Sequence, residues 1–271
     1  MDNSLDRITS KEKQLEEILR TYKNAAVAFS GGVDSTYVLH RAAHVLGKKN
    51  ILAVTVHSEL HPVAEVDEAE KLARGMGLPH LVVTLDLLTD PGIKNNVYER
   101  CYICKKSIFS KLKDLAAARG LAVIIDGTNA DDPDDDRPGL RALKELGIRS
   151  PLMEAGLTKE EIRALSLRNE LPTGNKPSAA CLATRFPHGE TLTAIALTRV
   201  AEAEAYIRSL GVNGNLRVRF HGGKLARIEV DPEEFALILA YREELYKKLS
   251  RSGFDYITID LKGFRSGSMN K

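Results

Sequence analysis

The chain has 271 residues, of which 43% are hydrophobic and 28% are charged, and its formal net charge is +2. This length and composition allow a sizeable core, in one large domain or two unequal ones. No apolar run approaches the roughly 20 residues that span a bilayer, and charges stand where a signal peptide is apolar, so we expect a cytoplasmic protein with no membrane partner. The near-neutral charge gives no sign of a nucleic-acid partner.

The first part of the chain alternates apolar runs rich in valine, isoleucine and leucine with amphipathic helical patterns. The expected strands lie in NAAVAFS, NILAVTVHS, PHLVVTLDL and LAVIIDGTN, and the expected helices cover residues 35–46, 62–76 and 105–119. Such alternation predicts parallel strands buried on both faces, and hence an α/β fold with a doubly wound parallel sheet. Sheets of this kind bind ligands at the carboxyl ends of their strands.

The pattern changes after about Glu190. A helix is expected over 192–210, followed by a hairpin that turns at Gly222 and Gly223, a helix over 232–249 and a strand in FDYITIDL. We therefore expect a first domain of residues 1–190 and a small C-terminal α+β domain of residues 191–271.

The stretch VAFSGGVDSTYVL joins the first expected strand to the first expected helix. Gly31 and Gly32 can adopt backbone angles closed to other residues, and Ser30 and Ser35 add hydroxyl groups beside the N–H groups of the helix start. The pattern predicts a phosphate-binding loop, although neither G-x-x-x-x-G-K-[ST] nor G-x-G-x-x-G is present. The alternative is a helix entry at which Ser30 and Asp34 cap N–H groups.

SGGxDS after a first strand resembles the pyrophosphate loop of the PP-loop ATP-pyrophosphatases. The resemblance implies that ATP is cut between its α- and β-phosphates while a substrate oxygen is adenylated, and that VHSEL and DGTNADD bind the adenosine. The nucleotide-binding residues it implies are Ser30, Gly31, Gly32, Asp34, Ser35, His57, Ser58, Asp126, Gly127, Thr128 and Arg137.

Two alternatives remain open within that nucleotide site. Strand-end capping also accounts for His57, Ser58 and Glu59. The acidic stretch 131–136 contains possible Mg²⁺ ligands, but such a run is also typical of a solvated loop. We expect Asp34 to be the catalytic carboxylate on the magnesium side.

Five further stretches are NNVYERCYICKKSIFSKL, DGTNADDPDDDRPGLRAL, NKPSAACLATRFPHGETLT, RVRFH and DLKGFRSGSMN. Together they resemble the LarE sulfur transferases over nearly the whole chain. The resemblance implies adenylation of a carboxylate of pyridinium-3,5-biscarboxylic acid mononucleotide and replacement of AMP by sulfur, a step in nickel-pincer nucleotide biosynthesis. It also implies a homo-oligomer.

The three cysteines are Cys101 and Cys104, in C-Y-I-C, and Cys181. Their spacing alone is compatible with a zinc site closed by His188 or His221, with a thiol redox pair, or with unrelated thiols. Resemblance to the three-cysteine branch of LarE implies instead that they bind a catalytic [4Fe-4S] cluster whose open iron carries an extra sulfide. In the one-cysteine branch, the residue matching Cys181 gives up its own sulfur and becomes dehydroalanine. The physiological sulfide donor is not indicated.

In LRVRFH, strand alternation puts Arg217, Arg219 and His221 on one face. Two guanidinium groups suit a mononucleotide phosphate, and Arg265 with Ser266 extends this predicted phosphate site. The alternative is a solvated basic strand face. For the whole chain, the other hypotheses are a tRNA-thiolating PP-loop enzyme and a non-catalytic nucleotide and iron–sulfur sensor.

Overall fold

The structure is a computed structural model that describes residues 2–132, 138–177 and 180–269. The chain folds into two compact units, which we call the first unit and the second unit. The first comprises Met1–Ser58, Val63–Leu85 and Cys101–Lys176, and the second comprises Glu59–Pro62, Asp86–Arg100 and Pro177–Lys271. Two short segments from the first half of the sequence therefore belong to the C-terminal unit.

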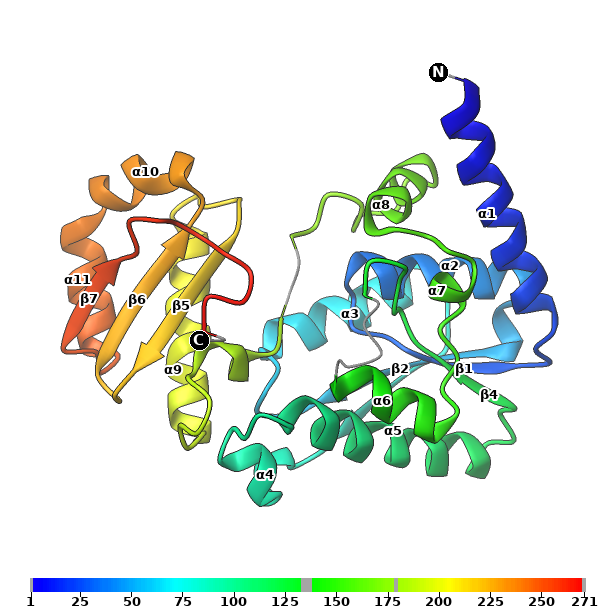
Figure 1. The fold of residues 1–271 in the computed structure, drawn as a ribbon, viewed down its shortest axis with the longest axis horizontal. Coiled ribbons are helices and arrows are strands. Elements are labelled where there is room, and N and C mark those ends of the chain that lie inside the picture. The colour runs from blue at the N-terminus through cyan, green and yellow to red at the C-terminus, as the bar shows by residue number, and fades with distance from the viewer. Residues whose placement is uncertain (1, 133–137, 178–179, 270–271) are drawn as a thin grey trace. The chain divides into compact units, whose positions relative to one another are not determined.

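The first unit is built on a parallel sheet of four strands, which confirms the predicted fold class (Figure 1). The strands are β1 (Ala25–Ala28), β2 (Ile51–His57), β3 (His80–Thr84) and β4 (Val123–Ile125), in the order β3-β2-β1-β4. Val27 of β1 pairs with Ile125 of β4, so the loops that follow these two strands emerge side by side. This is the point at which a doubly wound sheet binds ligands.

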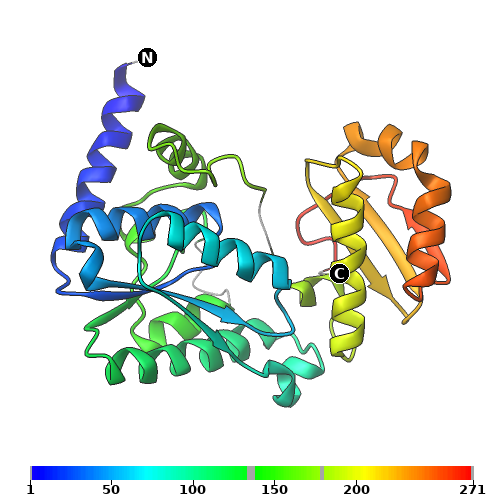
Figure 2. The same cartoon turned by 180° about the vertical axis from the view of Figure 1, so that it is seen from behind.

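Helices cover both faces of this sheet (Figures 1 and 2). One face packs against α1 (Asp2–Arg20), α2 (Val33–Leu46), α3 (Val63–Gly75), α7 (Pro151–Glu154) and α8 (Lys159–Arg168), and the other against α5 (Arg100–Ala118) and α6 (Pro138–Leu146). Val27 enters the first core and Ala26 the second, because successive strand residues point to opposite faces. Among the helices described, none is long and apolar enough to cross a membrane.

The second unit has a three-stranded sheet. Its strands are β5 (Leu216–His221), β6 (Leu225–Val230) and β7 (Tyr256–Ile259), and its longer helices are α9 (Ala194–Ser209), α10 (Phe235–Ala240) and α11 (Arg242–Arg251). β5 and β6 form the predicted antiparallel hairpin, and β7 pairs parallel with β6. The short elements are η1 (Lys48–Asn50) in the first unit and η2 (Leu87–Thr89), α4 (Pro91–Lys94), η3 (Leu182–Arg185) and η4 (Pro232–Glu234) in the second.

The helices differ from the sequence predictions in three respects. α5 begins at Arg100, not at residue 105, because no helix breaker separates the ERCYIC segment from the amphipathic part. The helix expected over 232–249 is interrupted at Tyr241, whose backbone angles are −96° and 13°. No helix was expected at α1, α4, α6, α7 or α8, although the capping box of Thr158 and Glu161 marks the start of α8.

A buried carboxylate ties three helices of the first unit together. Glu12 of α1 is 9% exposed and accepts hydrogen bonds from the Tyr37 hydroxyl of α2, at 2.8 Å, and from Arg168 of α8. Burial raises the pKa of Glu12. These two hydrogen bonds and the charges of Arg41 and Arg168 lower it by more than burial raises it, so the net pKa lies below its ordinary value. The ionised form of Glu12 therefore stabilises the fold.

Replacing Glu12 by glutamine should lower the free energy of unfolding by about 2 kcal/mol at neutral pH, because the buried Arg41 loses one of its two carboxylate partners and Arg168 loses its pairing with Glu12. A carboxyl group whose pKa is lower in the folded than in the unfolded state stabilises the fold at pH values above its unfolded pKa of about 4.3. This stabilisation disappears as the pH falls through the folded pKa. Urea unfolding should therefore show the difference between parent and variant shrinking in acid. Exposed Glu17→Gln is the control, and a pH-independent difference would contradict the role of Glu12.

Candidate functional site

The predicted phosphate loop lies between β1 and α2. Phe29 continues the β1–β2 pairing, its N–H donating to the Val54 carbonyl at 2.8 Å, and the chain then turns through Gly31, where φ is +69°. A Cβ atom on Gly31 would lie 3.2 Å from the Cβ of Ala69, so both the backbone angle and the packing favour glycine here.

Hydrogen bonds inside the loop set its shape. The Ser30 and Ser35 hydroxyls lie 3.1 Å apart, and the Ser35 hydroxyl donates to the Gly32 carbonyl at 3.2 Å. Gly32 is the N-cap residue of α2 and has no side chain with which to cap the first turn. The N–H groups at this helix start suit an anion, as expected, and Asp34 takes no part in capping within the described structure.

The end of β4 packs directly against this loop. A Cβ atom on Gly127 would lie 2.8 Å from the backbone nitrogen of Ser35, closer than real Cβ contacts. The neighbouring Asp126 accepts hydrogen bonds from the Thr128 hydroxyl, at 2.6 Å, and the Ser150 hydroxyl, at 2.7 Å, which fix the turn. The structure therefore brings Asp126, Gly127 and Thr128 together with the serine and glycine residues of the loop.

The remaining predicted nucleotide residues have different positions. His57 ends β2, and Ser58, 3% exposed, follows it in the first unit. Glu59 belongs to the second unit, where its carboxylate accepts a hydrogen bond from the backbone of Leu87 at 3.2 Å. Arg137 and the aspartates at 134–136 lie outside the described residues.

Asp34 carries the electrostatic signature of a cation ligand. Its Oδ2 atom pairs with Lys159 Nζ, whereas its Oδ1 atom is buried and, within the described residues, has no hydrogen-bond partner. Burial raises the pKa of Asp34, Lys159 lowers it, Asp132 raises it and the Asn129 side chain lowers it, and the net pKa lies above its ordinary value. Mg²⁺ takes carboxylate oxygens, so an orphaned carboxylate oxygen beside a phosphate loop fits this ion.

Two lysines that the sequence interpretation did not single out contact the loop. Lys159, at the start of α8, pairs with Asp34 as described. Lys176 donates to the Gly31 carbonyl at 3.0 Å and to the Glu68 carboxylate at 2.8 Å. The capping box before α8 could have placed Lys159 at a helix start, but no local pattern marks Lys176. Both cations suit the charge of a triphosphate.

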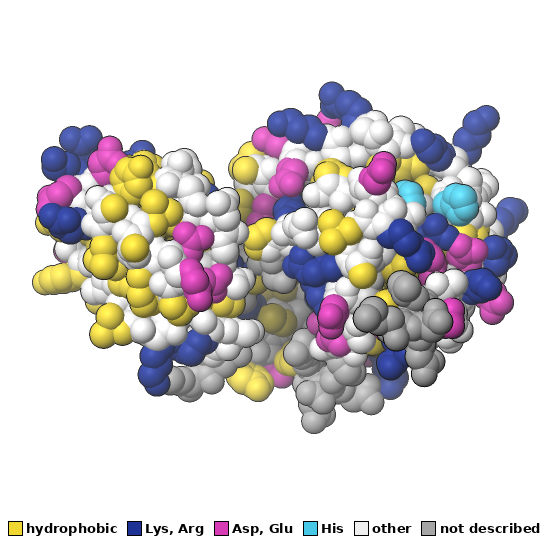
Figure 3. Space-filling view, turned by 90° about the horizontal axis from the view of Figure 1, so that it is seen from above, with side chains coloured by type: hydrophobic (Ala, Val, Ile, Leu, Met, Phe, Trp, Pro, Cys, Tyr) yellow, Lys and Arg dark blue, Asp and Glu magenta, His cyan; other side chains and the backbone are white. Residues whose placement is uncertain are grey.

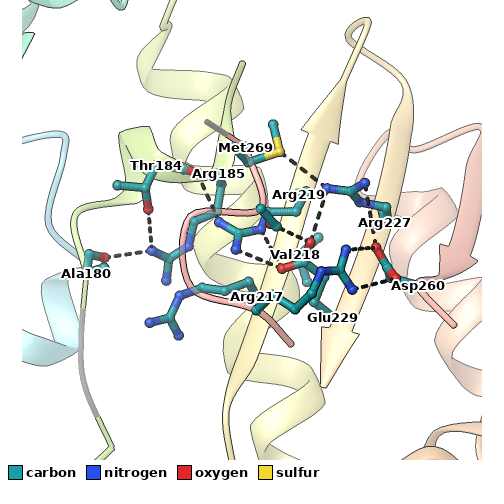
Figure 4. A network of polar contacts seen from close by, with 12 residues as sticks. Ala180, Thr184, Arg185, Arg217, Val218, Arg219, Arg227, Glu229, Asp260 and Met269 are labelled. Carbon is teal, nitrogen blue, oxygen red and sulfur yellow. Dashed lines mark hydrogen bonds and ion pairs between the residues drawn. The ribbon is translucent and has the colours of Figure 1, made fainter. Parts of the chain in front are cut away.

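Two of the arginines predicted to bind a phosphate, Arg217 and Arg219, lie in a buried polar network of the second unit (Figure 4). Arg217 and Arg219 are 6% and 4% exposed, so their strand face is not the solvated surface considered as the alternative. Arg219 pairs with the fully buried Glu229 at 2.7 Å and donates to the Thr184 carbonyl at 3.0 Å. Arg265 pairs with both carboxylate oxygens of Asp260 at 3.1 Å.

Arg217 differs from the other arginines of this network in its charge environment. Burial, and then the positive charge of Arg185, lower the pKa of Arg217 to about 10, although Glu204 opposes them. Its guanidinium group lies 5.3 Å from the ring centre of Phe264. Ser266, also predicted at this site, is exposed. Because burial and Arg185 both disfavour the charged form of Arg217, an anion beside this guanidinium group would stabilise it.

The three cysteines are divided between the units. Cys101 is exposed and Cys104 half-buried, and both lie near the start of α5 in the first unit. Cys181, half-buried, precedes η3 in the second unit, and its carbonyl accepts a hydrogen bond from the Thr184 hydroxyl at 2.8 Å. Cys101 and Cys104 share one face of the helix, since residues three apart are neighbours there.

The thiol set fits an iron–sulfur cluster by the chemistry of its donors, because three thiolates leave one iron of a four-iron cube open. Over the described ranges, however, no three His, Cys, Asp or Glu side chains are gathered closely enough to hold a metal ion. His188 and His221, the candidates for closing a zinc site, lie with Cys181 in the second unit, where the backbone carbonyl of Asn96 lies 3.3 Å from His188 Nδ1.

Comparison with known proteins adds relatives that align along nearly the whole chain. The asparagine synthase family model matches residues 12–132. A pyridinium-3,5-bisthiocarboxylic acid mononucleotide synthase of Lactiplantibacillus plantarum is 42% identical over 97% of this chain and 95% of its own length. Uncharacterized proteins of Synechocystis and Methanocaldococcus jannaschii are 40% and 30% identical, each over 97% of this chain and 98% of their own lengths.

Replacing Lys159 by methionine should weaken Mg–ATP binding about tenfold at neutral pH, because one charged contact to the phosphates is lost. It should also move the acid loss of binding to higher pH, since Lys159 lowers the pKa of Asp34 and only the ionised carboxylate takes Mg²⁺. Calorimetric titrations over a range of pH would measure both effects. Lys176→Met is the control, because Lys176 pairs with Glu68 and should leave the pH dependence unchanged. The same pH dependence in all three proteins would contradict the role of Lys159.

Proposed function

We propose that this chain converts a carboxylate of pyridinium-3,5-biscarboxylic acid mononucleotide into a thiocarboxylate. The chain belongs to the LarE family of ATP-dependent sulfur transferases. The observation that carries the proposal is the full-length similarity to a protein named as the bisthiocarboxylic acid mononucleotide synthase. The phosphate loop, the buried arginines and the three cysteines supply side chains for each part of that reaction.

The first step activates the carboxylate. A substrate carboxylate oxygen attacks the α-phosphorus of ATP, the bond to the β-phosphate oxygen breaks, and pyrophosphate leaves with that electron pair. Ser30, Gly31, Gly32 and Ser35 would hold the pyrophosphate, and Asp34 would hold the Mg²⁺ that neutralises it. His57, Ser58, Asp126, Gly127 and Thr128, with Arg137, would bind the adenosine.

Lys159 has a second role in that step. With the loop empty, it neutralises Asp34 and so limits the cost of a buried carboxylate. When Mg²⁺ binds Asp34, Lys159 would leave the carboxylate and pair with the phosphates. Asp34 and Lys159 would then each still have a partner of opposite charge. This exchange allows one buried carboxylate to serve both the empty and the loaded loop.

The second step forms the carbon–sulfur bond. A sulfide sulfur attacks the acyl carbon, the carbon–oxygen bond to phosphate breaks, and AMP leaves as the better leaving group. Cys101, Cys104 and Cys181 would hold a [4Fe-4S] cluster, which supplies, when bound, an open iron able to carry the extra sulfide. Because that sulfide is external, the chain would keep its own cysteines and turn over repeatedly.

The second unit would bind the phosphate of the mononucleotide. Arg217 lies among cations and is the main candidate, and Arg219, Arg265 and Ser266 are the further candidates. Glu229 pairs with Arg219 and Asp260 pairs with Arg265, which fixes the positions of both arginines. Because their charges are already paired, Arg219 and Arg265 would orient the phosphate more than they would add positive charge to the site. A preorganised guanidinium group loses little side-chain entropy when it binds a phosphate.

The same unit would form the contacts of a homo-oligomer. β7 lies at the end of the strand order, and Tyr256 of this strand is 66% exposed. Leu239 and Leu261 are 54% and 88% exposed, and Figure 3 shows hydrophobic side chains gathered on one face of this unit. Exposed apolar surface of this kind is typical of protein–protein contacts.

Surface charge favours the mononucleotide over tRNA as the substrate. On the face of the first unit that Figure 3 shows, basic and acidic side chains are intermixed and form no continuous basic band. The net charge of the whole chain is only +2. An enzyme that grips tRNA needs a basic surface along the phosphate backbone, and its binding is then strongly salt-dependent.

Anaerobically purified protein should contain about four iron atoms and four acid-labile sulfides per chain, because a [4Fe-4S] cluster needs both. Cys101→Ala, Cys104→Ala and Cys181→Ala should each lower iron and sulfide together, as measured by elemental analysis. His188→Ala and His221→Ala are controls that keep the three thiols and should retain the iron. Zinc in place of iron, or iron that persists in Cys104→Ala, would contradict the proposed cluster.

Arg217→Gln should raise the KM for the mononucleotide at least about tenfold, because a charged contact to its phosphate is lost, and should leave ATP affinity unchanged. Initial rates of thiocarboxylate formation at varied substrate concentration would show this. Lys224→Gln is the matched control on the same hairpin, since its exposed ammonium group pairs with Asp255 at 2.6 Å. Equal KM values in both variants would remove Arg217 from the phosphate site.

A further inference from the structure

We propose that Asn96 is a positioning residue that fixes the residue preceding Cys101 to the segment following Cys181. The proposal rests on the proposed function, because it concerns two of the cysteines assigned to sulfur transfer. Asn96 lies in the segment Asp86–Arg100, which comes from the first half of the sequence but belongs to the second unit. Every contact described below lies within that unit.

The backbone of Asn96 is held in an unusual conformation. Its φ angle is 47°, and within the described residues the only other positive φ outside glycine is the 53° of Glu170. Asn96 is fully buried, whereas such residues are more often found at exposed turns. A left-handed backbone costs conformational energy, and it persists only where surrounding contacts over-determine it, often at functional sites.

The contacts of Asn96 join two segments that are about ninety residues apart in sequence. Its amide Nδ2 donates to the carbonyls of Phe186, at 3.3 Å, and Pro187, at 2.7 Å. Its side-chain oxygen accepts a hydrogen bond from Arg100 Nη1, and its backbone carbonyl accepts one from the Gly189 N–H at 3.0 Å. We call this set of contacts the Asn96 clamp.

Both ends of the clamp lie close to a cysteine along the chain. Arg100 is 5% exposed and begins α5, and Cys101 is joined to it by a peptide bond. Phe186 follows Cys181 by five residues, and the turn between them is η3. The clamp therefore reaches each cysteine through a short stretch of ordered backbone.

The turn between Cys181 and Phe186 is itself anchored. Arg185, 4% exposed, donates to the carbonyl of Ala180 at 2.7 Å and to that of Cys181 at 3.3 Å. Glu204 of α9 holds the same guanidinium group by two hydrogen bonds, at 2.9 and 2.8 Å. Because this turn is braced against α9, a shift at Phe186 is transmitted to Cys181 and not absorbed between them.

The amide group of asparagine meets both requirements of this position. Asparagine tolerates the left-handed conformation better than most residues, and its amide offers two donors and an acceptor. Glycine would accept the backbone angle but would lose the side-chain contacts. Aspartate would keep the shape and the acceptor for Arg100, but it would place an oxygen against the Phe186 and Pro187 carbonyls, where no donor would remain.

The test compares the full-length parent with Asn96→Asp, Asn96→Gly and Glu170→Gly. Glu170→Gly relieves the other positive φ and has no part in the clamp, so it controls for backbone strain. Hydrogen exchange in the apo protein reports on the clamp through the Gly189 amide, which donates to Asn96, and the Leu192 amide, which donates to the Lys94 carbonyl at 2.7 Å. Asn96→Asp should speed both exchanges about tenfold or more, and Glu170→Gly should leave them unchanged.

The positioning role has its own readout. In the apo protein, a small thiol reagent should alkylate the half-buried Cys181 several-fold faster with Asn96→Asp than in the parent, as followed by mass spectrometry, because the segment after this cysteine loses its anchor. Asn96→Gly should lie between that variant and the parent. In loaded protein, Asn96→Asp should broaden the electron paramagnetic resonance signal of the reduced cluster.

Each outcome decides one claim. Unchanged exchange in Asn96→Asp would overturn the clamp, and faster exchange with an unchanged alkylation rate of Cys181 would overturn the positioning role. A parent that binds no iron, yet shows Asn96-dependent alkylation of Cys181, would refute the proposed cluster and support the clamp. A thermal melt of each variant separates these effects from loss of the fold.

Discussion

The close approach of β4 to the start of α2 is the constraint on which the nucleotide site depends. Gly127 packs so tightly on the backbone of Ser35 that no larger residue fits, and it does so because β1 and β4 are paired at Val27 and Ile125. The pairing therefore sets both the shape of the phosphate loop and the position of Asp126 beside it. A loop preorganised in this way loses little entropy when it binds an anion.

Charge balance organises both units. In the first, Asp34 is compensated by Lys159, and Glu12 by arginines and a tyrosine hydroxyl. In the second, the buried guanidinium groups of Arg185 and Arg219 are compensated by Glu204 and Glu229. A buried charge is tolerated only when it is paired, so an orphaned carboxylate oxygen marks a place for a ligand of opposite charge. Within the described residues, Oδ1 of Asp34 is such an oxygen.

Local signals predicted much of the fold, and long-range contacts account for what they left out. The strand–glycine–helix order of SGGVDS and the alternation in LRVRFH are local, and both segments have the expected structure. Lys159 and Lys176 contact loop residues more than one hundred positions away, so no spacing rule indicates them. The burial of Arg217 and Arg219 depends on segments from three parts of the chain, and a period-2 pattern cannot distinguish a buried arginine face from a solvated one. No local pattern indicates that Asp86–Arg100 belongs to the second unit, because that membership also depends on contacts between distant parts of the chain.

Sulfur delivery by an external sulfide distinguishes a catalyst from a protein that is consumed in one reaction. The most direct test is to count the thiocarboxylate groups formed per chain when anaerobic protein is given ATP, Mg²⁺, substrate and excess sulfide, while mass spectrometry follows Cys181. We predict many products per chain and an unchanged Cys181. At most one product per chain, with Cys181 converted to dehydroalanine, would contradict catalytic sulfur transfer through the three cysteines.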